Sequence, residues 1–146
     1  MTRLYCLLCV LLPLLAHAGE GSPQYYGSAP NMPFSAAVRA GDTLYVSGQI
    51  GSTAQGRLPD EFTDQANNAM SNVAHSLALA GASMDDVVKC TVMLTDMSQW
   101  SAFNVIYVRH FKPGKLPARS AIGASSLALG AKVEIECIAY LPKGRA

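Results

Sequence analysis

The residues of this chain whose types could support chemistry are one arginine, two glutamates and two uncharged polar residues. Arg119 lies at the start of a predicted strand, and Glu134 and Glu136 alternate along the last predicted strand. Ser47 and Asn104 lie within other regular elements. In general a guanidinium suits the binding of a carboxylate, and a carboxylate suits proton transfer. Composition alone favours a simpler interpretation, in which the arginine is a surface cation and the glutamates form a solvated strand face.

No established catalytic or cofactor-binding motif accompanies these residues. The sequence has no G-x-S-x-G, no phosphate-binding glycine loop and no H-E-x-x-H. The histidines His17, His75 and His110 are scattered, so no Ser-His-Asp set can be proposed. His75 has no partner at metal-ligand spacing, and we interpret it as a solvated residue. The sequence implies neither a metal ion nor an organic cofactor.

The first residues of the chain are typical of a secretory signal. Met1 to Arg3 carries one positive charge, 4–15 is almost wholly apolar, and Ala16-His17-Ala18 places small residues at a cleavage position. The apolar run has about a dozen residues, fewer than the roughly 20 that span a bilayer. We therefore expect residues 1–18 to be a signal peptide cleaved after Ala18. The mature chain would then be exported, to the periplasm, without membrane attachment.

Cleavage changes the charge of the chain. Loss of Arg3 leaves ten basic and ten acidic residues, a net charge of zero. Nucleic-acid binders usually carry a basic surface because phosphate contacts supply most of their non-specific affinity. We therefore predict no nucleic-acid partner.

Two cysteines remain after cleavage, Cys90 and Cys137. Both share the apolar parity of their predicted strands, so buried free thiols are the default interpretation. Export makes a disulfide chemically possible, and the order of the strands would decide whether the two Cα atoms lie within about 7 Å.

The remaining sequence predicts an irregular N-terminal arm at 19–33 and one α+β domain at 34–146. Apolar residues recur every three or four positions along both helices and alternate along the strands. The predicted order is β-β-α-β-α-β-β, with strands at 34–38, 43–50, 87–95, 118–125 and 131–140 and helices at about 62–80 and 98–111.

The strands have one apolar face and one mixed face. Leu44 and Val46, for example, oppose Tyr45 and Ser47. Two helices can cover only one face of such a sheet, so the other face needs water or a partner. A half-polar open face in a small domain suggests an oligomer interface, with any site built along it.

Five segments, in the right order, resemble the successive signatures of the RidA (reactive intermediate deaminase) family. They are A-G-D-T-L-Y-V-S-G-Q-I (40–50), M-D-D-V-V-K-C-T-V-M-L-T-D-M (84–97), N-V-I-Y (104–107), P-A-R-S (117–120) and V-E-I-E-C-I-A (133–139). Together they indicate that the resemblance extends over 34–140, nearly the whole mature chain.

The resemblance implies a chorismate-mutase-like homotrimer with the sheets inside, the two helices of each chain outside and a site in each inter-subunit cleft. It also implies hydrolysis of 2-imino acids, formed from enamines, to 2-oxo acids and ammonia. Arg119 would bind the substrate carboxylate and Glu134 would position the attacking water. Ser47 and Asn104 match polar positions that line the cleft.

Three positions depart from the family pattern. Phe34 replaces a tyrosine, Ala121 replaces a cysteine, and Gly123 replaces a residue that is often acidic. The leading hypothesis is therefore a deaminase-type hydrolase whose cleft includes Phe34 and Ala121. Binding of a small carboxylate without turnover is the first alternative. Endoribonuclease activity is a weaker one, because the net charge is zero.

Overall fold

The computed structural model describes residues 21–142. The predicted signal peptide, residues 1–18, lies outside this range, and so does the start of the arm. Within it, no helix is long and apolar enough to cross a membrane.

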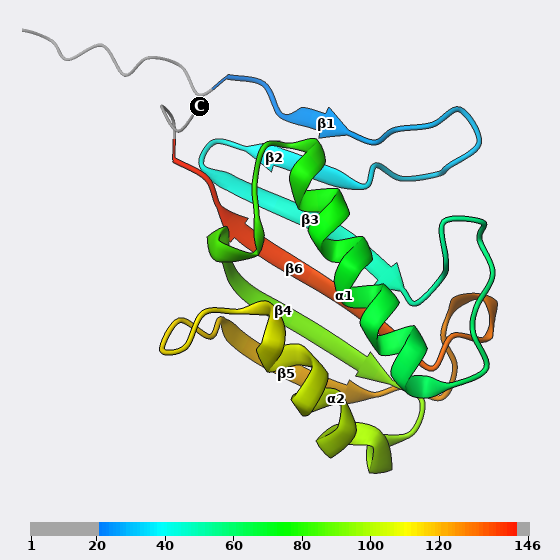
Figure 1. Cartoon of the computed structure of the whole chain (residues 1–146). Coiled ribbons are helices and arrows are strands. Elements are labelled where there is room, and N and C mark those ends of the chain that lie inside the picture. Colours follow the sequence, from blue (N-terminus) through cyan, green and yellow to red (C-terminus); the bar gives the residue numbers. More distant parts are fainter. Residues whose placement is uncertain (1–20, 143–146) are drawn as a thin grey trace, which may run out of the picture.

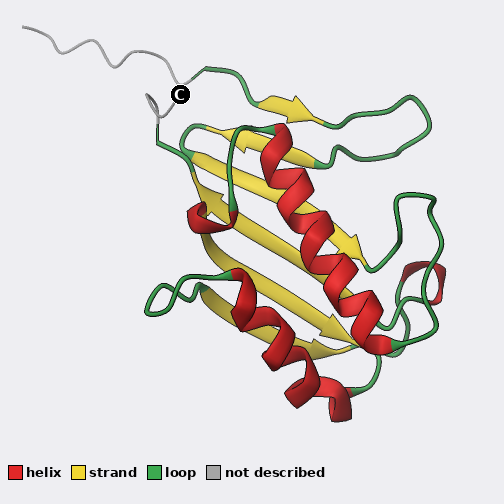
Figure 2. Cartoon of the chain, in the orientation of Figure 1, coloured by secondary structure: helices red, strands yellow, loops and turns green. Residues whose placement is uncertain are grey.

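The described chain forms one six-stranded sheet with two α-helices on one of its faces (Figures 1 and 2). The order across the sheet is β1-β2-β3-β6-β4-β5, and β4 and β5 are the only parallel neighbours in it. The strands are β1 (Gln24–Tyr26), β2 (Ala37–Ala40), β3 (Thr43–Ile50), β4 (Val87–Leu94), β5 (Ala118–Gly123) and β6 (Val133–Tyr140). This architecture confirms the predicted α+β fold class.

The helices form where the sequence has a three-to-four-residue apolar repeat. α1 (Phe62–Leu79) buries this stripe against β3 and β6 and ends before Gly81, whose φ of 72° suits a left-handed C-cap. α2 (Trp100–Tyr107) follows a short 3₁₀ turn, η2 (Met97–Gln99). The N-cap residue of this turn, Asp96, accepts a hydrogen bond from the Ser98 amide. A second 3₁₀ turn, η3 (Val108–His110), continues α2. Both predicted helices are confirmed.

Three local features differ from the sequence prediction. The arm at 19–33 is not wholly irregular, because β1 pairs with β2 and adds an outer strand. β2 begins at Ala37 and not at Phe34. In β4, a register shift between Val87 and Lys89 reverses the expected parity at one point. Val88 is therefore exposed, although the alternation predicted it to be buried.

The core lies between the helices and the sheet, and it contains a disulfide bond. Cys90 of β4 and Cys137 of β6 are direct partners across the two strands, with Cα atoms 4.1 Å apart, and their sulfurs are bonded. Both residues are buried, as their strand parity predicted, but they are not the free thiols that were the default interpretation. The bond joins neighbouring central strands of the sheet.

The sheet face away from the helices is open and chemically mixed. It carries the half-exposed aromatic rings of Tyr45 and Tyr140 together with Ser47 and Glu136. Both helices lie on the opposite side of the sheet, so no helix of the described chain covers this face (Figure 2). The mixed, uncovered face predicted from the strand patterns is confirmed.

Candidate active site

Arg119 lies on the helix side of β5, where one polar and three aromatic side chains of α2 surround it. We call these four residues of α2 the bracket. Its Nη2 donates a 2.7 Å hydrogen bond to Oδ1 of Asn104. Its guanidinium carbon lies 4.5 Å from the ring centres of both Trp100 and Tyr107 and 6.0 Å from that of Phe103. Contacts of a guanidinium with aromatic faces are each worth about 0.5–2 kcal/mol. The arginine is thus held by one short stretch of α2.

The sequence of α2 explains this bracket. Trp100, Asn104 and Tyr107 recur at spacings of four and three, so they lie on one face of the helix. β4 pairs in parallel with β5, and Arg119 is the register partner of Cys90, whose side chain lies in the core under the helices. Parallel neighbours in register point the same way, which directs the arginine towards α2.

Tyr107 is unusual because its hydroxyl is buried without a hydrogen-bond partner among the described residues. Burial raises the pKa of this phenol to about 12, and the charge of Arg119 opposes the shift. The phenol therefore stays neutral at physiological pH. Its ring stabilises the arginine, while its oxygen is a hydrogen-bonding group that the described chain leaves unused.

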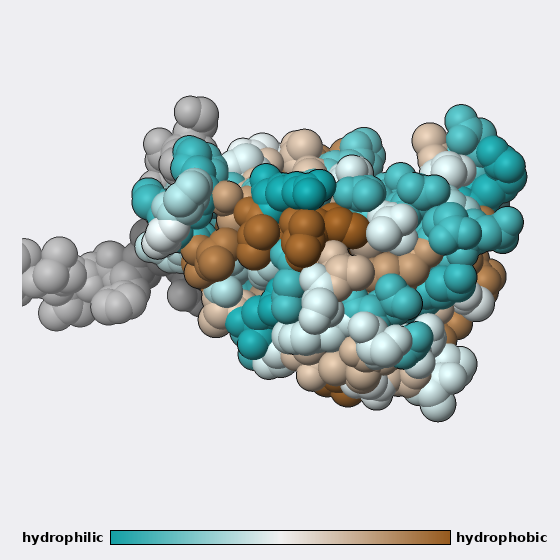
Figure 3. Space-filling model, turned by 60° about the horizontal axis from the view of Figure 1, so that its bottom comes forward, coloured by the Kyte–Doolittle hydropathy of each residue, from teal (hydrophilic) through white to brown (hydrophobic). Residues whose placement is uncertain are grey.

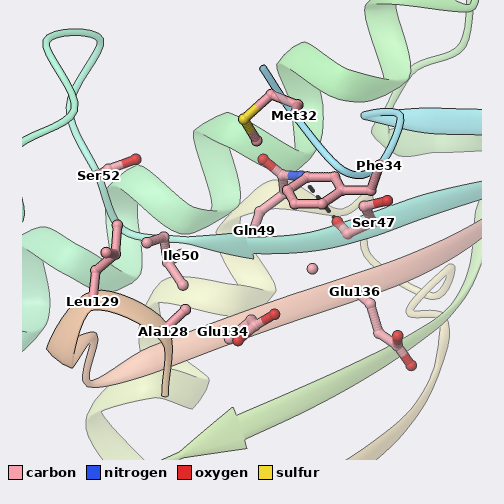
Figure 4. Close-up of a pocket in the computed structure, with 11 residues that line it drawn as sticks. Met32, Phe34, Ser47, Gln49, Ile50, Ser52, Ala128, Leu129, Glu134 and Glu136 are labelled. Atoms are coloured by element: carbon pink, nitrogen blue, oxygen red, sulfur yellow. Dashed lines mark hydrogen bonds between the residues drawn. The ribbon is translucent and has the colours of Figure 1, made fainter. Parts of the chain in front are cut away.

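A pocket of about 690 Å³ lies on the opposite face of the sheet (Figure 4). Glu134 and Glu136 reach this face because they alternate with buried residues of β6. The pocket also contains Ser47 and Gln49 of β3 and Ser52 of the following loop. The pocket has two carboxylates and no lysine or arginine among its lining residues. It is therefore acidic in the isolated chain.

The position of the Glu134 carboxylate depends on a glycine. A Cβ atom built on Gly48 would lie only 2.0 Å from Oε1 of Glu134, so the absent side chain makes room for this carboxylate. Next to it, the Ser47 hydroxyl donates a 2.7 Å hydrogen bond to the Ser35 carbonyl, and the Gln49 amide donates to the Ser47 carbonyl. Ser47 can still accept a hydrogen bond from a ligand.

The structure thus divides the six predicted site residues into two groups of three. Arg119, Asn104 and Ala121 lie on β5 and α2, with Ala121 on the same side of β5 as the arginine. The other group, Phe34, Ser47 and Glu134, surrounds the pocket on the open face. We call them the arginine group and the acidic pocket. One chain by itself does not bring them together.

Several contributors were not predicted as site residues. Trp100 and Tyr107 were assigned to the apolar stripe of their helix, and only the packing of β5 shows that they contact Arg119. Gly48 and Gln49 lie inside the resemblance segment 40–50, but spacing alone does not indicate their roles. The glycine that follows Ser47 was a possible signal, because a strand-interior glycine often marks a close approach.

The arginine group lies near a surface with exposed apolar side chains. Figure 3 views the molecule from the α2 and β5 side and shows apolar residues gathered beside hydrophilic ones. Val105 on α2 and Val108 on η3 are each about half exposed. Exposed apolar area of this kind often belongs to an interface.

Comparison with known proteins identifies the family. The model of the family described as endoribonuclease L-PSP matches residues 27–141. A crystal structure named as RidA, from an Antarctic Psychrobacter bacterium, is 35% identical, with a TM-score of 0.76 over 81% of this chain and 99% of that one. The chain belongs to the RidA family.

Two further RidA-type relatives bear on the site. The 2-iminobutanoate/2-iminopropanoate deaminase of Mus musculus is 41% identical over 109 residues, which cover 73% of this chain and 80% of the mouse protein. The crystal structure of TdcF of E. coli with bound serine is 32% identical, with a TM-score of 0.70 over 75% of this chain and 88% of that one. The range that the family model matches, 27–141, includes both the arginine group and the acidic pocket.

No metal site is evident in the part of this RidA chain that the structure describes. Among residues 21–142, no cluster of three or more histidine, cysteine, aspartate or glutamate side chains could hold an ion. His75 is exposed, as predicted.

Proposed function

We propose that this protein hydrolyses reactive 2-imino acids, in equilibrium with their enamines, to 2-oxo acids and ammonia. The observation that carries the proposal is the arginine group: a permanent cation held at a defined position by Asn104 and two aromatic rings. Such a guanidinium binds a carboxylate through two parallel hydrogen bonds. The mouse relative, named as a 2-iminobutanoate/2-iminopropanoate deaminase, supports the reaction class.

The complete site would form between copies of the chain in a homotrimer. The arginine group brings a positive charge and the acidic pocket brings Glu134 and Glu136 without a cation. These charges are complementary, which favours their juxtaposition across an interface. The uncovered sheet face around the acidic pocket supports the same arrangement, because it needs a partner or water.

In the proposed reaction, Arg119 holds the substrate carboxylate while Glu134 of a neighbouring copy orients a water molecule. The water oxygen forms a bond to the imine carbon, and the C=N π electrons move to nitrogen, which is protonated. Glu134 accepts the first proton that the water loses and passes it to the amine nitrogen. As the C–N bond then breaks, the hydroxyl loses its remaining proton to Glu134 and its electron pair forms the C=O bond, and Glu134 releases that proton to solvent. A 2-oxo acid and ammonia leave. Fixing the two reactants removes much of the entropic barrier, so modest acid-base assistance suffices.

Small-carboxylate binding without turnover is the second candidate. Phe34 and Ala121 lack the hydroxyl and thiol that the resemblance leads one to expect, so part of the polar lining is absent. The TdcF crystal structure contains bound serine, so this relative holds a small amino acid. RNA cleavage lacks comparable support, because we expect a mature chain without net charge.

We also propose that the mature protein acts after export, in the periplasm. The sequence of residues 1–18 supports this location, and a buried disulfide fits an oxidising compartment. In that setting the imine would come from a source other than cytoplasmic enzymes, for example from the oxidation of amino acids.

The direct test uses imines generated in situ by an amino-acid oxidase and follows the release of 2-oxo acid and ammonia. The mature wild type, expected to begin at Gly19, should accelerate release. Arg119→Ala should reduce kcat/KM to near background, since a hydrogen-bonded charge pair is lost. Arg109→Ala is the matched control, because it removes an exposed arginine of η3, and it should retain activity. If Arg119→Ala still accelerates the release of 2-oxo acid, Arg119 is not the carboxylate anchor. If the wild type accelerates no release, small-carboxylate binding without turnover is favoured.

A mixing experiment tests whether sites are shared between copies. Arg119→Ala and Glu134→Gln should each be inactive alone. Co-assembled in equal amounts, they should recover about a quarter of wild-type activity, because each site would combine one group from each of two copies. If no activity returns in mixed oligomers, both groups must act within one chain or the reaction assignment is wrong.

A further inference from the structure

The acidic pocket has an apolar wall that the hydrolysis reaction itself does not require. Besides the two glutamates, the pocket is lined by Met32 and Phe34 of the segment before β2, Ile50 at the end of β3, and Ala128 and Leu129 of the 3₁₀ turn η4 (Ala128–Gly130) (Figure 4). We call these five residues the apolar wall. They come from three separate segments of the chain and converge beside Glu134.

Leu129 is the most unusual member of the apolar wall. It is 81% exposed, more than any other large apolar residue in the described chain. It is also the only non-glycine residue there with a positive φ, at 56°. A leucine in this region costs roughly 1–2 kcal/mol relative to ordinary backbone, and glycine avoids that cost. A strained, solvent-exposed leucine at the mouth of a pocket is poorly explained by the stability of the monomer.

The dimensions of the pocket agree with an apolar ligand group. Its volume of about 690 Å³ in the isolated chain falls within the roughly 300–1,000 Å³ typical of small-molecule sites, so there is space beside the glutamates for a side chain longer than that of a three- or four-carbon acid. With the carboxylate on Arg119 and the imine carbon near Glu134, the substrate side chain is the part left to contact the wall.

We infer that the apolar wall selects imino acids with larger apolar side chains, such as those derived from leucine, methionine or phenylalanine, and that Leu129 is a specificity-determining residue. This inference rests on the proposed function. It extends it from the small imines in the mouse relative's name to a side-chain class. A correctly placed methylene in an apolar pocket is worth about tenfold or more in kcat/KM.

The test compares the leucine-derived imine with the alanine-derived imine in wild type, Leu129→Gly and Leu116→Ala. Wild type should prefer the leucine-derived imine by at least about tenfold in kcat/KM. Leu129→Gly should lose most of that preference while keeping its activity on the alanine-derived imine. Leu116→Ala is the matched control, because Leu116 is a half-exposed leucine outside the pocket, and it should behave like wild type.

Thermal unfolding and size-exclusion chromatography distinguish selectivity from structure. Because glycine relieves the positive φ at position 129, Leu129→Gly should unfold at the same temperature as wild type or higher, and its oligomeric state should not change. A fall in stability or a smaller oligomer would overturn the inference, since Leu129 would then pack against a neighbouring copy. Equal kcat/KM values of the wild type for the leucine-derived and the alanine-derived imine would also overturn the inference. Inactivity towards every imine would instead refute the proposed function.

Discussion

Reduction of the Cys90–Cys137 disulfide should weaken the folded protein by a calculable amount. The bond closes a loop with a sequence separation of 47 residues between two central strands. Reduction lets the unfolded chain explore conformations that the closed loop forbids, whereas the folded chain keeps both sulfurs in the core. In the chain-entropy treatment, a loop of this length contributes about 4 kcal/mol to the free energy of unfolding.

That difference is large for a domain of this size. Typical domains are stable by about 5–15 kcal/mol, so the bond would supply a substantial fraction of the total. It corresponds to a decrease in Tm of roughly 12–20 °C on reduction. The reduced protein should nevertheless fold, because the buried strands and helices on either side of the bond make an extensive apolar core.

Denaturant unfolding of the mature protein, with and without a thiol reductant, measures the effect at one fixed protein concentration. The concentration must be matched because oligomers gain stability by mass action. Titration of the unreduced, unfolded chain should find no free thiol at position 90 or 137. Two free thiols there, or free energies of unfolding that agree within about 1 kcal/mol, would refute the reasoning. A double Cys90→Ala and Cys137→Ala variant should be insensitive to the reductant and serves as the control.

Three further perturbations have defined outcomes. Gly48→Ala should lower kcat by about 10²-fold with little change in the free energy of unfolding, because the new Cβ displaces only the flexible Glu134 carboxylate; wild-type kcat would contradict this role. Burial raises the pKa of Tyr107 from 10.0 to about 12, so stability should fall as the pH rises between these values, and Tyr107→Phe should abolish that dependence in alkaline unfolding curves. Burial lowers the pKa of His110 below 6.5, so its contribution to stability is complete above pH 6.5 and is lost as the pH falls below it. His110→Gln should flatten this acid dependence, and an unchanged slope in acid denaturation would show that another group controls it.

The parts of the fold that follow from local periodicity were predictable from the sequence. The apolar stripe of α1 specifies both its length and its buried face, and Gly81 marks its end. Alternation in β6 correctly assigned Ile135 to the core and Glu134 to the open face. These properties depend on side-chain repeats that match the geometry of one element.

Other features depend on partners distant in the sequence. The three residues of β1 form a strand because they pair with the edge of β2. A segment of three residues is too short to show an alternation of apolar and polar side chains. The disulfide required knowledge that β4 and β6 are neighbours with Cys90 opposite Cys137. The face of β5 to which Arg119 points could not be predicted from the sequence either. Arg119, Ala121 and Gly123 share one face of this strand, and that set is no more apolar than the residues of the other face. The direction of Arg119 follows from the parallel register with Cys90 of β4, and the side chain then packs against the aromatic rings of α2.

Trp100, one of the aromatic residues that surround Arg119, is the single tryptophan of the chain. Its fluorescence therefore comes from one known place, with the guanidinium 4.5 Å from the indole ring centre. A carboxylate that joins Arg119 changes the electric field and the solvation of that ring, so the emission should respond to occupancy of the arginine group even when no bond is made or broken. The protein thus contains its own optical probe, placed where binding and turnover can be observed separately.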